Sequence, residues 1–104
     1  MVVRISKGRC ASERHAEVTA RLDASAASLL LAIRRMPGCR HCYAGTDAAT
    51  CRRVNVSAWD TLEHAQAKGS LPEMAALAGE FIALGVEFER PIANYPVLWQ
   101  LPAA

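Results

Sequence analysis

The residue types that suggest chemistry in this sequence lie close together, in residues 53–59. Arg53, Asn55, Ser57 and Trp59 occupy alternate positions, and side chains at alternate positions of a strand share one face of a sheet. A cation, an amide, a hydroxyl and an indole on one face are typical of a pocket wall, where the indole could stack on a flat ligand. The alternative is structural: the indole closes one end of the sheet, and the polar groups form hydrogen bonds across a dimer.

Two residues of the preceding segment could complete such a pocket. His41 and Tyr43 also alternate, and hairpin pairing predicts that they lie near the face that carries Arg53. A free imidazole titrates near about pH 6.5, so His41 is the candidate base for deprotonating a phenol. A structural, hydrogen-bonded role is the alternative. We expect the other two histidines, His15 and His64, to be solvated.

Two arginines could hold an anionic part of a ligand. Arg4 lies in the first predicted strand and Arg53 in the third, and a guanidinium binds carboxylates and phosphates through two parallel hydrogen bonds. Alternatively, both arginines could pair with Glu87 or Glu89. The candidate substrate-binding residues are therefore Arg4, Tyr43, Arg53, Asn55, Ser57 and Trp59.

The four cysteines, Cys10, Cys39, Cys42 and Cys51, raise the possibility of a metal or redox site. Cys39 and Cys42 have the C-x-x-C spacing of redox and zinc sites. They follow a Pro-Gly turn and enter a predicted strand, where residues three apart point to opposite faces. We therefore expect free thiols packed as small apolar groups and no metal, with a redox or zinc site as the alternative.

Composition limits the classes of partner. The chain has 104 residues, 52% of them hydrophobic, and a net charge of +2 without a basic block, so one domain over residues 1–104 and no nucleic-acid partner are expected. The longest apolar run falls far short of the roughly 20 residues that span a membrane, so no membrane association is expected. The first residues lack the pattern of an export signal, so we expect a cytoplasmic protein.

Hydrophobic periodicity predicts the order strand, helix, strand, strand, helix, strand, which is the ferredoxin-like α+β arrangement of an antiparallel sheet with helices on one face. The predicted strands are residues 2–6, 39–46, 50–59 and 92–101, and residues 86–89 are predicted to be a short extended segment. The predicted helices are residues 12–36, a short segment after Asp60, and 70–84, the last beginning with a capping box of Ser70 and Glu73 and ending at Gly85.

The faces of the strands predict a homodimer. Val54, Val56 and Ala58 suit the helices, which leaves the polar face that contains Trp59 on the other side. The last strand carries large apolar groups on both faces, Trp99 among them. Helices can cover only one face of such a sheet, so we expect a second copy to cover the other. The two tryptophans would then report on dimer formation.

With these features in place, the sequence resembles the antibiotic biosynthesis monooxygenase-like (ABM) family. The resemblance rests on the strand-to-helix segment 54–65, on the Met-Pro-Gly-Cys turn at 36–39, and on the element order over the whole chain. The tail at 85–95 is similar to that of a branch with no assigned reaction. The resemblance implies a dimeric α/β barrel, in which the exposed faces of two sheets enclose cavities.

The resemblance also implies two kinds of chemistry. Some relatives oxidise polycyclic aromatic substrates with oxygen and with neither metal nor flavin. Others degrade haem with an Asn on strand one, a Trp at the end of strand three and a His on the second major helix. Trp59 matches that Trp, but strand one offers Arg4 and Ser6, and the helix over residues 71–84 has no His. No haem or other cofactor is therefore expected.

The leading functional hypothesis is a cofactor-independent monooxygenase that acts on a small aromatic molecule. In this hypothesis His41 or a nearby polar group removes a proton, and the resulting carbanion reacts with oxygen. The substrate is held by Tyr43, Arg53, Asn55 and Trp59. The alternative is a non-catalytic dimeric module that binds a metabolite or serves a stress response. That alternative predicts a cavity filled by the protein's own side chains, with no perturbed titratable group facing it.

Overall fold

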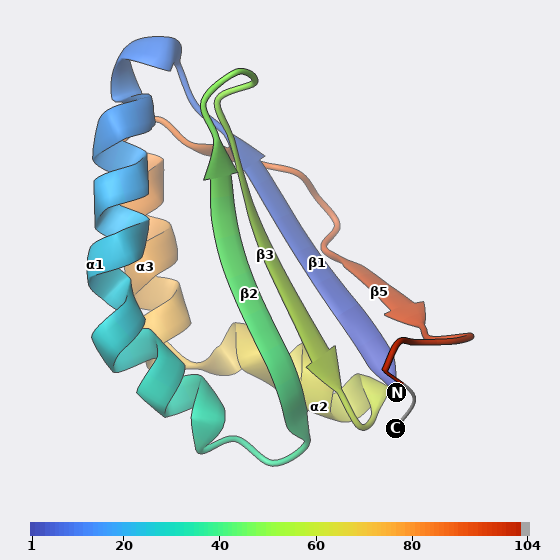
Figure 1. Ribbon diagram of the computed structural model, residues 1–104. Coiled ribbons are helices and arrows are strands. Elements are labelled where there is room, and N and C mark those ends of the chain that lie inside the picture. The colour runs from blue at the N-terminus through green and yellow to red at the C-terminus, as the bar shows by residue number, and fades with distance from the viewer. Residues whose placement is uncertain (103–104) are drawn as a thin grey trace.

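The computed structural model describes residues 1–102 and places one layer of helices against one antiparallel sheet (Figure 1). The strands are β1 (Val2–Arg9), β2 (Cys39–Asp47), β3 (Arg52–Trp59), β4 (Glu87–Phe88) and β5 (Ala93–Pro96). The helices are α1 (His15–Arg34), α2 (Leu62–Ala67) and α3 (Pro72–Ala83), with 3-10 turns η1 (Ser12–Arg14) and η2 (Lys68–Ser70). The strand order is β2-β3-β1-β4, and β5 also pairs with β1. The predicted α+β arrangement is confirmed.

The last strand is shorter than predicted. Of the segment 92–101, only Ala93–Pro96 pairs with β1, with Tyr95 opposite Val3. Pro96 has no N–H to contribute to a ladder. The next backbone N–H, of Val97, donates to the carbonyl oxygen of Met1 at 3.0 Å, and strand β5 ends there.

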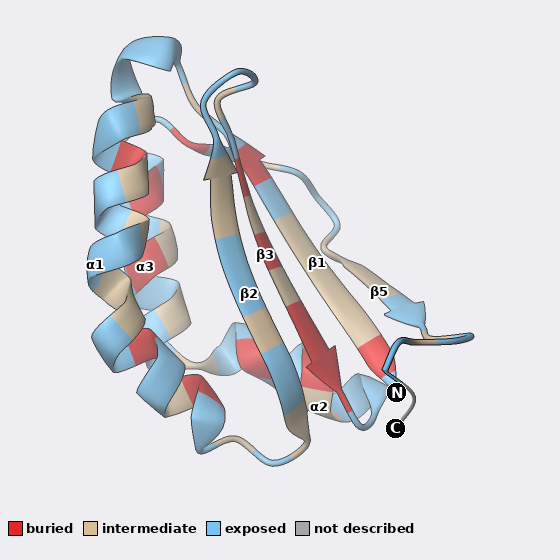
Figure 2. Ribbon diagram, in the orientation of Figure 1, coloured by how far each residue is buried: buried red, intermediate tan, exposed pale blue. Residues whose placement is uncertain are grey.

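The predicted apolar stripes of the two long helices form the core. Figure 2 shows the buried positions of α1 and α3 facing the sheet, with β3 the most continuously buried strand. The buried core consists of Val2, Val18, Leu29, Ile33, Trp59, Ala65, Leu77, Phe81 and Val86. Trp59 is 0% exposed, and Phe81 is its largest fully buried companion. Among residues 1–102, no helix is both long and apolar enough to cross a membrane.

The assignment of the two faces of β3 was wrong. Arg53, Asn55 and Ser57 are buried and face the helices, as does Trp59, whereas Val54 and Val56 are only half-buried and face the other way. Contacts with α3 and η2 decide the assignment, because the Arg53 guanidinium lies over the Phe81 ring and Lys68 reaches Asn55. Hydropathy alone favours the valines as the inner face. Here the Lys68 ammonium bonds to Asn55 and Ser57, and aromatic rings pack against Arg53, so the polar face is buried.

Two helix termini agree with the sequence prediction, and one differs. Helix α3 begins at Pro72 without a side-chain cap, so the predicted capping box of Ser70 and Glu73 was wrong: Ser70 belongs to turn η2. Helix α2 is capped by Thr61, whose Oγ1 accepts from the His64 N–H at 3.1 Å. Gly85 follows α3 with a φ of 85°, the left-handed conformation expected of a glycine that ends a helix.

A second glycine holds the turn before β2. Gly38 has a φ of 82°, and a Cβ built there would lie 2.1 Å from Nδ1 of His64. Its carbonyl oxygen also accepts from the Asp60 N–H at 2.9 Å. The turn between α1 and β2 therefore packs directly on α2, and only glycine meets both requirements.

We expect Gly38→Ala to lower the free energy of unfolding by more than about 1–2 kcal/mol, the conformational penalty alone, because the new methyl must also displace His64. The matched control is Gly79→Ala, in α3, where a Cβ meets nothing within 4 Å. That substitution should raise stability by about 0.5–1 kcal/mol through helix propensity. Urea unfolding of both variants measures the difference, and equal effects of the two would contradict this account of the turn.

Candidate functional site

Asn55 lies where two hollows between the helices and the sheet meet. The larger is a groove of about 740 Å³ between α1 and β2, and the smaller is a cavity of about 170 Å³ between α3 and strands β1, β3 and β4. Asn55 and Leu22 line both. A ligand in either hollow would therefore contact the same amide.

A buried network of hydrogen bonds holds the side-chain amide of Asn55 in place. Lys68 is 2% exposed, and its Nζ donates to Asn55 Oδ1 at 2.5 Å and to Ser57 Oγ at 3.1 Å. The Sγ of Cys42 lies 3.8 Å from the same Nζ. Trp59 donates from Nε1 to Ser57 Oγ at 2.8 Å. We call these five residues the Lys68 cluster.

The Lys68 cluster contains a cation and no carboxylate. Burial lowers the pKa of Lys68, and the nearby Arg4 lowers it further, while Cys42 acts in the opposite direction. Because the ammonium occupies Asn55 Oδ1, the amide nitrogen of Asn55 is the end that can donate to a ligand in the hollows. The lysine thus fixes which way the amide points.

Arg53 forms part of the wall of the smaller cavity. It is 5% exposed, and its Cζ lies 5.4 Å from the ring centroid of Phe81 and 5.1 Å from that of Phe88. Its Nε and Nη1 are buried without a hydrogen-bond partner among the described residues. Burial lowers the pKa of this guanidinium.

Five of the six sequence-predicted binding residues form two groups on the helix side of the sheet. Arg4, Arg53 and Asn55 line the smaller cavity. Ser57 and Trp59 lie beneath it as members of the Lys68 cluster, and Trp59 lines neither hollow. The indole therefore acts through its hydrogen bond and its packing.

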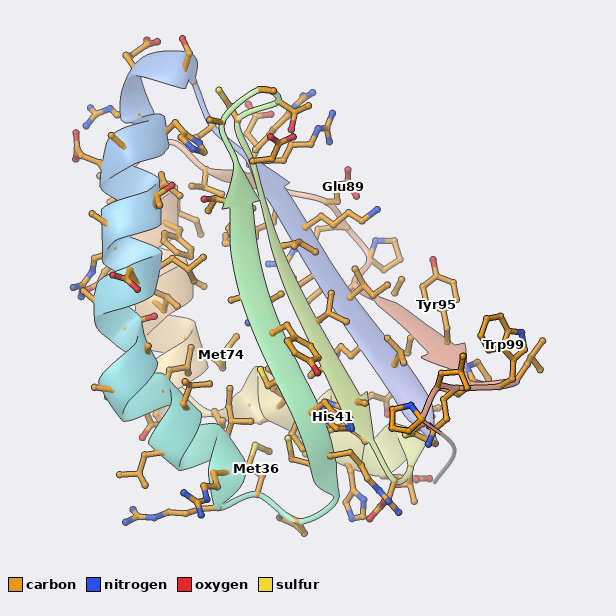
Figure 3. All side chains as sticks on the ribbon, in the orientation of Figure 1. Met36, His41, Met74, Glu89, Tyr95 and Trp99 are labelled. Atoms are coloured by element: carbon orange, nitrogen blue, oxygen red, sulfur yellow. The ribbon has the colours of Figure 1, made fainter. Side chains whose placement is uncertain are left out.

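His41 and Tyr43 were expected near the Arg53 face, and this placement was wrong. The turn over residues 48–51 sets the hairpin register so that His41 pairs with Ala58 and Tyr43 with Val56, on the uncovered face. The two rings stack there, with centroids 6.3 Å apart. Tyr43 borders the large groove only because β2 is an edge strand. In Figure 3, Met74 of the smaller cavity lies on the helix side, whereas Tyr95 and Trp99 lie beyond the opposite side of the sheet.

The other two histidines are not solvated as expected. His64 is half-buried against Gly38, and its Nδ1 is buried without a partner among residues 1–102. His15 is half-buried at the rim of the large groove, where its Nε2 lies 3.4 Å from Thr19 Oγ1. His15 is thus the histidine on the helix side of the sheet that borders a hollow.

The C-x-x-C pair also lies differently from the prediction. A β-bulge between Cys39 and His41 places Cys39 opposite Trp59 and Cys42 opposite Ser57, so both thiols pack on the helix side. All four cysteines are free, as expected. The part of the chain that the structure describes contains no group of three His, Cys, Asp or Glu side chains that could hold a metal. Burial raises the pKa of Cys39, which disfavours its thiolate form.

Comparison with known proteins identifies the architecture. No family model and no curated protein matches the sequence, but solved structures match over nearly the whole chain. A Deinococcus radiodurans protein provisionally assigned as an antibiotic biosynthesis monooxygenase superimposes with a TM-score of 0.74 at 18% identity, covering 100% of this chain and 99% of that one. The fold is that of the antibiotic biosynthesis monooxygenases. It confirms the resemblance at the level of architecture.

Two further structures share this monooxygenase fold. A Nitrosomonas europaea protein with the same provisional assignment has a TM-score of 0.70 at 15% identity, and it covers 99% of this chain and 93% of that one. SnoaB, a cofactor-independent oxygenase from Streptomyces nogalater, has a TM-score of 0.62 at 18% identity, covering 97% of this chain and 96% of that one.

Within this monooxygenase fold, Lys68 is the site residue that sequence analysis missed. It follows a short helix and precedes Gly69, a context typical of a solvated lysine. The only signal was indirect: Asn55 and Ser57 on one face of a buried strand require a hydrogen-bond donor, and Lys68 is the donor that turn η2 carries to them.

The lowered pKa of Lys68 predicts a distinctive pH dependence of stability. In the window between its pKa in the folded protein and its usual value of 10.5, the unfolded chain binds more protons than the folded chain, so the free energy of unfolding rises with pH. Lys68→Met removes this contribution, and the matched control Lys7→Met, at an exposed site, retains it.

Urea unfolding over about pH 8 to 10 measures the effect, since subtracting the Lys68→Met curve from the wild-type curve cancels the titration of other groups. Parallel curves for wild type and Lys68→Met would show that the buried ammonium is not penalised by its surroundings.

Proposed function

We propose that this protein is a member of the ABM-like family and a cofactor-independent monooxygenase that acts on an electron-rich aromatic small molecule held between the sheet and the helices. The observation that carries the proposal is the position of Asn55, whose amide lies at the junction of the two hollows and is oriented by Lys68. SnoaB, which shares the fold, is a cofactor-independent oxygenase, and this supports the reaction class.

In this mechanism the protein stabilises the substrate as an anion. A phenol or its keto tautomer loses a proton, and the resulting anion is electron-rich enough to react with oxygen. Lys68, Arg4 and Arg53 lie on this side of the sheet without a carboxylate partner among the described residues, and a cationic environment lowers the pKa of a bound phenol. The Asn55 amide can donate to the developing oxyanion.

The reaction balances without a reductant. A CH₂ carbon beside the aromatic rings loses its first proton to solvent or to a basic side chain, and the carbanion adds to oxygen to form a hydroperoxide. Loss of the second hydrogen and cleavage of the O–O bond then give a C=O group and one molecule of water. Anthrone fits this scheme, because with one oxygen molecule it yields anthraquinone and water.

The alternative, a non-catalytic module, predicts no perturbed titratable group at the cavity. Arg4 and Arg53 both line the smaller cavity, and Nε and Nη1 of Arg53 are buried without a hydrogen-bond partner among the described residues. This favours a site for a charged or polar ligand over a cavity that the protein fills itself.

Asn55→Ala should slow anthrone-dependent oxygen consumption by about 100-fold or more, the usual effect of removing one oxyanion donor. His41→Ala, on the uncovered face, should leave the rate within a factor of two, because His41 lies on the opposite side of the sheet from Asn55. An oxygen electrode measures both rates. Loss of activity in His41→Ala together with full activity in Asn55→Ala would move the chemistry to the other face and contradict the proposal.

We also propose that two copies pair through the uncovered face of the sheet. This face carries Tyr95 and Val3 opposite each other, with Val56 on the neighbouring strand, and Trp99 beyond it is 80% exposed. An exposed, mainly apolar sheet face is typical of an interface. Both hollows open on the helix side, so pairing would leave them accessible.

Tyr95→Lys should shift the protein to a monomer, because it places a charge in the centre of the proposed interface. The matched control is Ile82→Lys in α3, since the two side chains have similar exposure, 55% for Tyr95 and 61% for Ile82. Light scattering after size-exclusion chromatography gives the mass of each variant. A monomeric wild type, or a dimer that survives Tyr95→Lys, would contradict this interface.

A further inference from the structure

We propose that the smaller cavity binds the carboxylate of an aromatic acid and that Arg53 is its main contact. The inference names the substrate class for the site described above, so the orientation that it gives the substrate rests on the proposed function. Binding of the carboxylate itself does not depend on any reaction.

The charge of the cavity wall is the first argument. Three arginines, Arg4, Arg53 and Arg90, line the cavity, and no aspartate or glutamate is among its lining residues. Burial is the larger cause of the lowered pKa of Arg4, and the nearby charge of Arg90 lowers it further. A concentration of positive charge around a space of this size favours an anion as its occupant.

The acidic residues that sequence analysis offered as partners are engaged elsewhere. Glu87 pairs with Arg9 at 3.1 Å, and Glu89 pairs with Arg52 at 3.3 Å. Among the described residues, Arg53 forms no ion pair. The structural explanation for Arg53, neutralisation by the acidic tail, therefore does not hold.

The hydrogen-bonding state of Arg53 is the second argument. Phe81 and Phe88 contact the guanidinium through their ring faces, and such contacts do not satisfy its N–H donors. Nε and Nη1 remain buried and unpartnered. A buried donor without an acceptor destabilises the folded protein, and the cost is larger when the donor is charged. A carboxylate oxygen that accepts from one of these N–H groups would remove part of this penalty.

The size and lining of the cavity indicate which part of the ligand, besides its carboxylate, the cavity can hold. A volume of about 170 Å³ lies below the range of about 300–1,000 Å³ usual for a whole ligand site, so the cavity suits the acid group and part of one ring. Phe81, Phe88 and Leu77 supply an apolar wall for that ring. The remainder of a larger molecule can extend past Asn55 and Leu22, which also line the groove of about 740 Å³.

Isothermal titration with benzoate and its neutral isostere benzamide tests the proposal. Benzoate should bind saturably and at least about tenfold more tightly than benzamide, because only the carboxylate can accept charge-assisted hydrogen bonds from Arg53. Arg53→Met should weaken benzoate binding by a similar factor and leave benzamide unchanged. The matched control Arg52→Met, one residue away and exposed, should bind benzoate as the wild type does.

Thermal unfolding separates lost binding from lost folding. Arg53→Met removes a buried, unpartnered cation and keeps an unbranched side chain, so its melting temperature without ligand should equal or exceed that of the wild type. Arg90→Gln is the second variant: its side chain is exposed, and it should also weaken benzoate binding. Equal affinity for benzoate and benzamide, undiminished benzoate binding by Arg53→Met, or tighter binding of inorganic phosphate than of benzoate would each overturn the proposal.

The outcome can be distinguished from that of the oxygenase proposal. Anthrone carries no carboxylate, so its oxidation does not require the arginine contact. Anthrone oxidation without benzoate binding would refute the carboxylate site alone. Benzoate binding that depends on Arg53, without oxidation of anthrone or of any anthrone carboxylic acid, would refute the reaction and support the carboxylate site.

Discussion

A lysine ammonium buried without an acidic partner is the interaction on which the candidate site depends. Removing an ammonium from water costs several kcal/mol even in real protein interiors, and Lys68 recovers part of that cost through Asn55 Oδ1, Ser57 Oγ and the thiol of Cys42. The same bonds order three neighbouring side chains. Asn55 is held with its nitrogen available to the hollows, and Ser57 is held between the lysine and the Trp59 indole. Lys68 thus sets the orientation of Asn55 and Ser57 and adds a positive charge beside that of the arginines of the cavity.

Burying polar residues on the helix side has a consequence for the rest of the molecule. The inner face of β3 contributes an arginine, an asparagine and a serine where a small α+β domain usually places aliphatic side chains, so the apolar core is displaced toward Trp59, Ile33 and Phe81. The valines of β3 lie on the outer face instead. Cavity and proposed interface therefore arise together from one alternation of residues along β3, and a shift of one residue in its register would exchange them.

The order of elements was predictable because it depends on periodicity, which each segment displays by itself. The stripe of α1 was found in this way, and the turn at Gly38 and the end of α3 at Gly85 were found from the glycines that end the helices. The face of β3 was not, since a period of two identifies two faces but does not say which one the helices cover. The placement of His41 failed for a related reason: hairpin register depends on turn 48–51 and on the bulge after Cys39, and neither has a sequence signal strong enough to fix it. Lys68 was missed because it lies in turn η2, whereas the groups that accept its hydrogen bonds lie on strands β2 and β3.

The two cations of the site differ in a way that assigns them different tasks. Lys68 has its hydrogen-bond acceptors within the protein and lines neither hollow, so it can act on a ligand only through Asn55 and through its charge. Arg53 has aromatic contacts but unfilled donors, and it lines the cavity directly. Lys68, whose N–H donors have acceptors in the protein, orients Asn55, whereas Arg53, whose Nε and Nη1 have none among the described residues, is proposed to bind the ligand. Because the unfilled donors of Arg53 destabilise the empty protein, an anion that fills them gains affinity from the penalty it removes, and this makes Arg53 the residue through which ligand binding and stability are most directly linked.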